Sequence, residues 1–191
     1  AEALRALTCV PRFFVEGYNN NNNNNNNSSD DDAGGSLNQD AEKTRVAELL
    51  YGSIEPVLAS TDVDQEIKEC ALAAAASLLE SLDANLKPEQ KERLLTLLLE
   101  RLSNETTRIA AMKSLLSIAE AESRVDLSCI LAPATSTIAS FLKLQSRSSK
   151  QSALEALDVL VRNHGSHEVF ADGTFFAQVL KEFSIVDSDL H

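Results

Sequence analysis

Few residues of this chain have the side-chain type and the spacing that metal binding or catalysis requires. His164 and His167 stand close together in NHGSH, and two imidazoles at such spacing can bind a metal ion. Glu168 follows them, but no cysteine or second carboxylate stands at ligand spacing. We favour a loop in which Gly165 ends a helix, and we expect no metal and no cofactor.

Sequence patterns of enzymes are also missing. The chain has no nucleophile elbow, phosphate-binding loop, HExxH pair or EF-hand loop. The acidic pairs, such as Glu120 with Glu122 and the run 30–32, fall at helix ends and in loops. We therefore predict a protein that is not an enzyme and takes no small-molecule substrate.

Composition and charge indicate the fold class and argue against several kinds of function. The chain has 191 residues, 43% of them hydrophobic, and its abundant Leu and Ala favour helix over strand. Its formal charge is −12 and it has no run of Lys or Arg, which argues against nucleic-acid binding. The longest apolar window, 71–79, is too short to span a membrane. Cysteines without CxxC pairing suit a reducing compartment.

An internal repeat organises the chain. The segment DQEIKECALAAAASLL (64–79) matches NETTRIAAMKSLLSIA (104–119) at an offset of 40 residues, and SSKQSALEALDVLV (148–161) follows at an offset of 42. Apolar spacings of three and four residues make each segment an amphipathic helix, called a B helix here. The stripe expected to be buried comprises Ala71, Leu72, Leu115, Ile118, Leu154 and Leu157.

A second helix, called an A helix here, precedes each B helix. The expected A helices are 45–60, 88–102, 126–142 and 174–186, with Pro56 and Pro133 expected to kink two of them. Asp64 and Asn104 are predicted N-caps of B helices. Two helices in a period of 40 to 42 residues predict an all-α solenoid of antiparallel HEAT pairs.

The period of 40 to 42 residues divides the whole chain into repeats and one insertion. We interpret 17–40, with its run of Asn, Asp, Gly and Ser, as a disordered insertion in an inter-repeat loop. We interpret the chain as a fragment of a longer protein, because amphipathic helix patterns run into both of its ends. The predicted parts are the end of a repeat (1–16), the insertion (17–40), three repeats (41–86, 87–123 and 124–166) and the start of a truncated one (167–191).

Partner contacts are expected on outward positions of the B helices and at the A–B junctions. Lys68, Arg108 and Lys150 recur at one repeat position and would either cap carbonyls and neutralise acidic neighbours, or face an acidic partner. The predicted contact residues are Glu66, Glu69, Asn104, Thr107, Arg108, Lys113, Ser149 and Glu155.

Several motifs resemble a known family. These are L-x-N-E-x-T-R at 102–108, V-D-L at 125–127, A-S-F-L at 139–142 and S-A-L-E-x-L-D at 152–158, in order along the chain. They are similar to the middle HEAT repeats of the cullin-associated and neddylation-dissociated family, over about 62–191. The Asn-rich insertion and the Ala-rich stretch 71–76 depart from that pattern.

The resemblance implies a partner and an activity. Such a protein would wrap an unneddylated cullin with its RING subunit, compete with adaptor and substrate-receptor modules, and promote their exchange. Another HEAT scaffold, such as a transport receptor or phosphatase scaffold, and a purely architectural segment stay open as alternatives.

Overall fold

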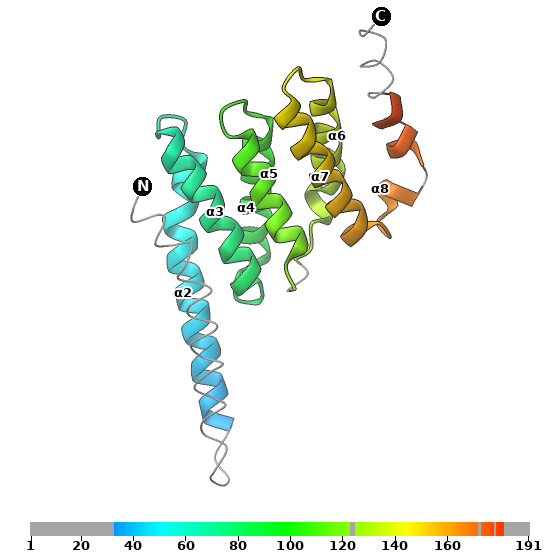
Figure 1. Ribbon diagram of the computed structural model, residues 1–191. Coiled ribbons are helices and arrows are strands. Elements are labelled where there is room, and N and C mark those ends of the chain that lie inside the picture. The colour runs from blue at the N-terminus through cyan, green and yellow to red at the C-terminus, as the bar shows by residue number, and fades with distance from the viewer. Residues whose placement is uncertain (1–32, 123–124, 172, 178, 182–191) are drawn as a thin grey trace, which may run out of the picture. The chain divides into compact units, whose positions relative to one another are not determined.

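Helices make up all the regular structure in the residues that can be described. A computed structural model describes residues 33–122, 125–171, 173–177 and 179–181 (Figure 1). The elements are α2 (Ala33–Ala59), α3 (Gln65–Leu82), η1 (Asp83–Asn85), α4 (Pro88–Ser103), α5 (Arg108–Glu120), α6 (Ser128–Ser140), η2 (Phe141–Lys143), α7 (Arg147–His164) and α8 (Glu168–Ala171). Residues 174–177 and 179–181 are also helical. The predicted all-α class of repeated helix pairs is confirmed.

The first helix is longer than the sequence indicates. The structure differs from the predicted insertion at residues 33–40, which form the first turns of α2 instead of a disordered segment. A helix nucleated by its buried stripe farther along extends at one hydrogen bond per residue, and the Ala, Gln and Glu residues near 39–42 are good helix formers. The segments 1–16 and 17–32 lie outside the described residues.

The chain divides into two compact units, 1–94 and 95–191, which are described separately. In the first unit α2 packs against α3. Ala47, Leu50, Ile54 and Leu58 of α2 are at most 5% exposed, at spacings that place them on one helical face. The facing α3 contributes small buried residues, including Ala71 and the run 74–76, which permit close approach of the two helices.

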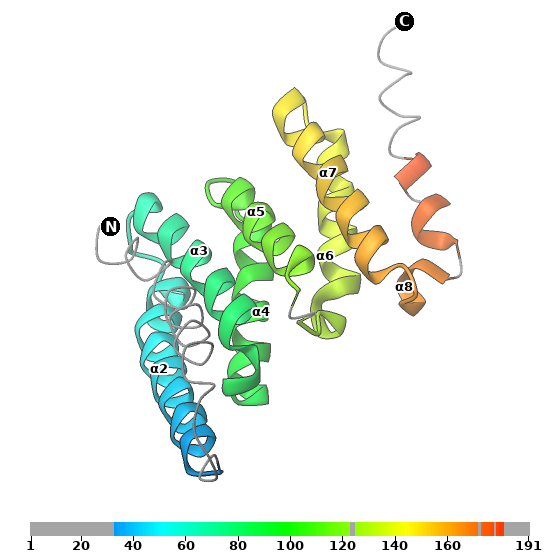
Figure 2. The ribbon, with the colours of Figure 1, turned by 60° about the horizontal axis from the view of Figure 1, so that its bottom comes forward.

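In the second unit α5 and α6 both pack against α7. The helices α5 and α7 lie side by side when the molecule is turned (Figure 2). Leu115, Ile118 and Leu157 are buried, as are Ala71 and Leu72 in the first unit, so these parts of the predicted stripe are confirmed. The prediction of a buried Leu154 is wrong, because this side chain is 41% exposed. In the described residues no further B helix follows α7 to cover it.

The helix ends show which capping predictions succeed. Asp64 occupies the N-cap position of α3, although its side chain makes no capping hydrogen bond. Asn104 does not cap α5, because α5 begins at Arg108 and its N-cap is Thr107. The Asn104 Oδ1 instead accepts from the backbone N and the hydroxyl of Thr106, at 3.0 and 2.9 Å, and so closes the turn before the helix.

Candidate functional site

The predicted contact residues of the first unit lie on the first turns of α3. Glu66 is exposed, while Glu69 is half-buried and accepts a hydrogen bond from Gln65 Nε2 at 2.7 Å. Lys68 is 9% exposed and its Nζ donates to the backbone carbonyl of Thr61 at 2.8 Å. The ammonium therefore caps a carbonyl of the α2–α3 turn, which is the structural role considered for this position.

In the second unit, Thr107 and Arg108 serve the junction between α4 and α5. Thr107 is fully buried, and its hydroxyl donates to the carbonyl of Arg101 at 2.8 Å. The prediction of an outward Thr107 is wrong, because this hydroxyl satisfies a carbonyl at the C-terminal end of α4. Asn104 beside it is exposed.

Arg108 joins α5 to the end of the next A helix. Its guanidinium carbon lies 4.4 Å from the centroid of the Phe141 ring in η2, a cation–π distance. Phe141 is 5% exposed, and Arg108 Nε is buried without a hydrogen-bond partner. The attraction to the ring face thus holds a half-buried guanidinium against the neighbouring repeat.

The remaining predicted residues lie on α5 and α7. Lys113 and Glu155 are exposed, as outward positions should be. Ser149 is half-buried, and its backbone N donates to Ser146 Oγ at 3.2 Å, so that Ser146 is the N-cap of α7. Lys150, the last member of the recurring basic set, is half-buried one residue later.

The sequence interpretation missed a set of ion pairs at the N-terminal half of α4. Lys87 Nζ lies 2.8 Å from Glu48, Lys91 Nζ 2.9 Å from Asp83, and Arg93 Nε 3.0 Å from Glu55. Because Glu48 and Glu55 belong to α2, two of these pairs connect consecutive A helices. No spacing rule within one helix could have revealed pairs formed between repeats.

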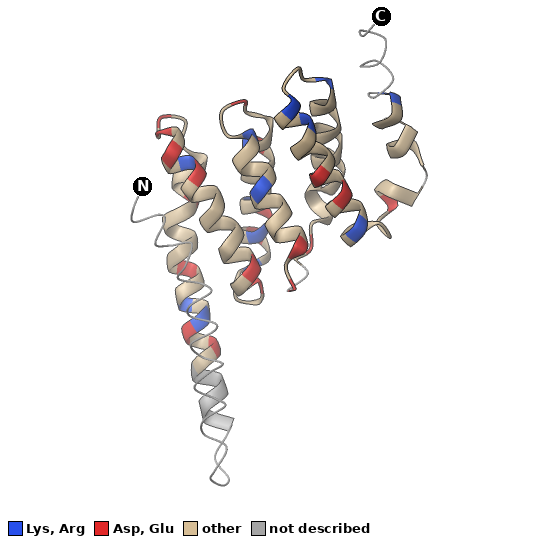
Figure 3. Ribbon diagram, viewed as in Figure 1, with Lys and Arg blue, Asp and Glu red and all other residues tan. Residues whose placement is uncertain are grey.

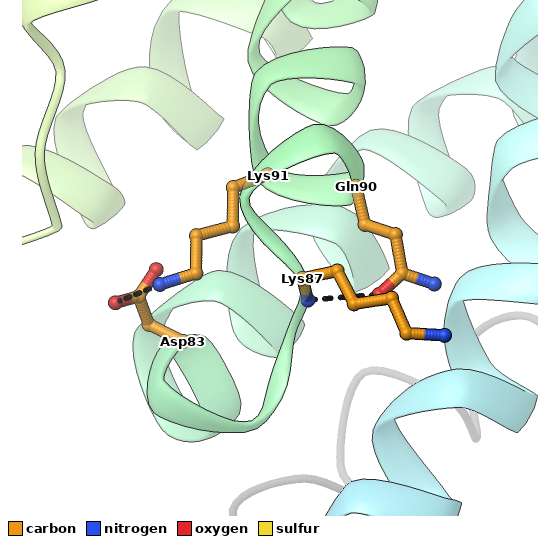
Figure 4. Close-up of polar contacts among 4 residues, drawn as sticks. All are labelled: Asp83, Lys87, Gln90 and Lys91. Carbon is orange, nitrogen blue, oxygen red and sulfur yellow. Dashed lines mark hydrogen bonds and ion pairs between the residues drawn. The ribbon is translucent and has the colours of Figure 1, made fainter.

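The start of α4 carried a signal that could have been used. The backbone N of Lys87 donates to Gln90 Oε1 at 3.0 Å, beside the Lys91–Asp83 pair (Figure 4). This is the reciprocal half of a capping box, with Lys87 as N-cap, Pro88 in the first helical position and Gln90 in the third. Pro followed two residues later by Gln indicates such a start.

His164 lines a groove of about 570 Å³ at the C-terminal ends of α5 and α7, with Asp126 on its wall. Burial lowers the pKa of His164, the charge of His167 lowers it further, and Asp126 opposes the shift. Hydrogen bonds from the Ser128 hydroxyl and backbone N lower the pKa of Asp126. The described residues contain no group of three ligands that could hold a metal ion.

The predicted contact residues differ in their exposure to solvent. Of the predicted contacts, Glu66, Asn104, Lys113 and Glu155 are exposed and Thr107 is not available. Across the described helices, no stretch is sufficiently long and apolar for a transmembrane span. Repeated helix pairs with exposed B-helix positions define a helical-repeat protein that can present an extended surface.

Comparisons with known proteins identify the family. The chain is 42% identical over 108 residues to cullin-associated NEDD8-dissociated protein 2 of Rattus norvegicus, covering 56% of the chain and 8% of the relative. It is 33% identical over 144 residues to cullin-associated NEDD8-dissociated protein 1 of Drosophila melanogaster, covering 74% of the chain and 11% of the relative. The Dictyostelium discoideum protein 1 is 37% identical over 105 residues. No protein-family model matches the chain.

These matches confirm the resemblance found in the repeat motifs. The chain belongs to the cullin-associated NEDD8-dissociated family. It spans about a tenth of the length of the relatives that it matches, and their names denote no enzyme.

Proposed function

We propose that this chain is part of a cullin-binding protein that assembles and exchanges cullin–RING ubiquitin ligases. It would bind an unneddylated cullin with its RING subunit, and compete with the adaptor and substrate-receptor modules. Neddylation of the cullin would exclude it. This binding and exchange would take place in the cytoplasm and nucleus.

The observation that carries the proposal is the identity of 33% over 144 residues to a protein named for its cullin association. The structure supports it with helix pairs whose B helices expose side chains to solvent, since such repeats present broad surfaces to protein ligands.

The test is co-elution with a purified cullin–RING pair, performed once with unmodified cullin and once with neddylated cullin. We expect the chain to co-elute with the unmodified pair alone. In a second arm, the chain replaces the corresponding segment of the Drosophila relative. A folded chimera that no longer binds the unmodified pair would contradict the proposal and favour another HEAT scaffold.

Individual contacts can be tested by charge reversal. We propose that Glu66, Glu69, Asn104, Arg108, Lys113, Ser149 and Glu155 contribute to the contact, with Thr107 removed from the set. Reversing Lys113 to Glu and Glu69 to Lys in the chimera should weaken cullin binding. Unchanged affinity of the folded variants would exclude these two residues.

A further inference from the structure

We infer that the second unit carries a docking surface for an acidic segment of a protein partner. The surface consists of the first two turns of α5, the end of η2 and the first turn of α7, and it is called the basic edge here. Its members are Arg108, Lys113, Lys143, Arg147 and Lys150. The inference does not require that the partner be a cullin.

Charge is segregated sharply at the basic edge. Residues 106–119 contain Arg108 and Lys113 and no acidic residue, and residues 127–154 contain Lys143, Arg147 and Lys150 and none either. The whole chain has 29 acidic against 17 basic residues, so two uninterrupted stretches of positive charge stand out. An acidic chain that keeps a positive surface here can attract a negative ligand to that place.

The fold brings these stretches together. The helices α5 and α7 pack against each other, and Arg108 stacks on Phe141, two residues before Lys143. Arg147 is the first residue of α7 and Lys150 follows one turn later. Figure 3 shows basic residues at the beginnings of both α5 and α7 and in the turn before α7.

Three of the five positive charges form no ion pair within the described residues. No carboxylate in the described residues lies within ion-pair distance of Lys113, Arg147 or Lys150, whereas Lys87, Lys91 and Arg93 in the first unit are all paired. The first turns of α5 and α7 contain no acidic residue, although the positive end of the helix dipole favours one there. Basic residues at positions that the helix dipole disfavours are typical of a functional surface, where local preferences are violated.

An acidic protein segment fits this surface better than a nucleic acid. A chain of formal charge −12 repels a long polyanion, and five basic side chains are too few for the many phosphate contacts on which nucleic-acid affinity depends. Carboxylates on a short peptide can approach the basic edge without bringing further negative charge close to the acidic remainder of the chain. Exposed Gln145, Ser146 and Ser148 add polar groups between the charges.

The experiment measures binding of a fluorescent oligoglutamate peptide to the full chain by anisotropy, over a range of ionic strength. The test variant is Lys113→Gln with Arg147→Gln and Lys150→Gln. The control variant is Arg45→Gln with Arg162→Gln and Lys181→Gln, which removes the same three charges elsewhere. A third variant, Lys113→Arg with Lys150→Arg, keeps the charge while changing the side chains.

We expect the peptide to bind in a salt-sensitive manner and the test variant to bind about tenfold more weakly, since each exposed charge pair contributes a few-fold. The control should change affinity by about twofold or less, and the Arg variant should bind as the parent does. Equal weakening by test and control variants, or no binding by a parent chain with a helical circular dichroism spectrum, would overturn the inference. Tighter binding of a single-stranded oligonucleotide of equal charge would also overturn it.

Discussion

The two units differ in how several of their basic side chains are used. In the first unit, Lys87, Lys91 and Arg93 each meet a carboxylate, and Lys68 caps a carbonyl. In the second unit, no carboxylate of the described residues pairs with Lys113, Arg147 or Lys150. The same repeat architecture therefore permits positive charge either to connect consecutive helices or to face solvent.

The second unit holds its helices together by other means. Arg108 stacks on Phe141, the Thr107 hydroxyl donates to Arg101, and Asn163 Nδ2 donates to the carbonyl of Ala119 at 2.9 Å. These contacts use a ring face and backbone carbonyls instead of carboxylates. The charges of Lys113, Arg147 and Lys150 take no part in these contacts, so a surface that includes them can change with little effect on stability.

The largest expected effect concerns the core of the second unit. Leu115→Asp places a charge without a partner at a position that is 2% exposed, and it should cost about 4 kcal/mol or more in free energy of unfolding. Leu154→Asp is the matched control, because Leu154 is 41% exposed and should cost about 1 kcal/mol or less. Urea unfolding followed by circular dichroism measures both. Similar losses would contradict the burial difference between these leucines.

A pair of glycines offers the next comparison. A Cβ at Gly165, at the end of α7, would overlap the backbone carbonyl oxygen of Val161, so Gly165→Ala should destabilise by about 1–3 kcal/mol. A Cβ at Gly52 in α2 would meet no atom within 4 Å, so Gly52→Ala should stabilise by about 0.5–1 kcal/mol. Thermal unfolding of both variants checks the opposite signs. A gain in melting temperature for Gly165→Ala would show that α7 can end without glycine.

Removing charge tests the comparison directly. Glu48→Gln with Glu55→Gln breaks two pairs of the first unit and should cost about 1 kcal/mol or less in total, since both pairs are partly exposed. Lys113→Gln with Arg147→Gln and Lys150→Gln should cost nothing, or stabilise by about a few tenths of a kcal/mol, because no carboxylate of the described residues pairs with these side chains and two of the charges leave the first turn of α7. Denaturation midpoints at low and high salt measure both effects. A clear loss in the second variant would reveal a packing role for the basic edge.

The smallest expected effect is a pH dependence that arises in the second unit, where all three histidines stand. The pKa of His164 in the folded chain lies below its ordinary value of 6.5, because burial disfavours the charged imidazole. Below pH 6.5 the unfolded chain therefore binds the proton more readily, and stability falls as the pH drops through that value. The lowered pKa of Asp126 adds a separate loss only in the more acidic range below 3.8.

His164→Gln isolates the histidine contribution. Between about pH 7.5 and 5.5, the parent chain should lose more stability than this variant, as measured by urea midpoints. Parallel losses in both chains would assign the dependence to other groups.

The sequence predicted the helical class and the burial of five of the six residues in the expected stripe, because a period of 40 to 42 residues and apolar spacings of three and four are local properties. It failed where a residue depends on its neighbours in space. As a polar residue Thr107 was predicted to face outward, yet its hydroxyl donates a hydrogen bond to the carbonyl of Arg101 at the end of α4. Leu154 has the spacing of a core residue but lacks a covering helix in the described residues.

The candidate site shows the same division. The exposure of Lys113 and Glu155 follows from helical spacing alone, whereas the stacking of Arg108 on Phe141 joins residues from different repeats. The extension of α2 back to Ala33 was missed because helix propagation depends on the stability of the turns that follow.

The contact between Arg108 and Phe141 also has a mechanical consequence. A guanidinium is attracted to a ring face anywhere within about 6 Å of its centroid, while a hydrogen bond weakens steeply once its donor–hydrogen–acceptor angle falls below about 120°. The α5–η2 junction therefore combines a contact that tolerates sliding with the fixed Thr107–Arg101 hydrogen bond in the adjacent turn. We expect this junction to behave as an elastic coupling that lets neighbouring repeats twist without separating.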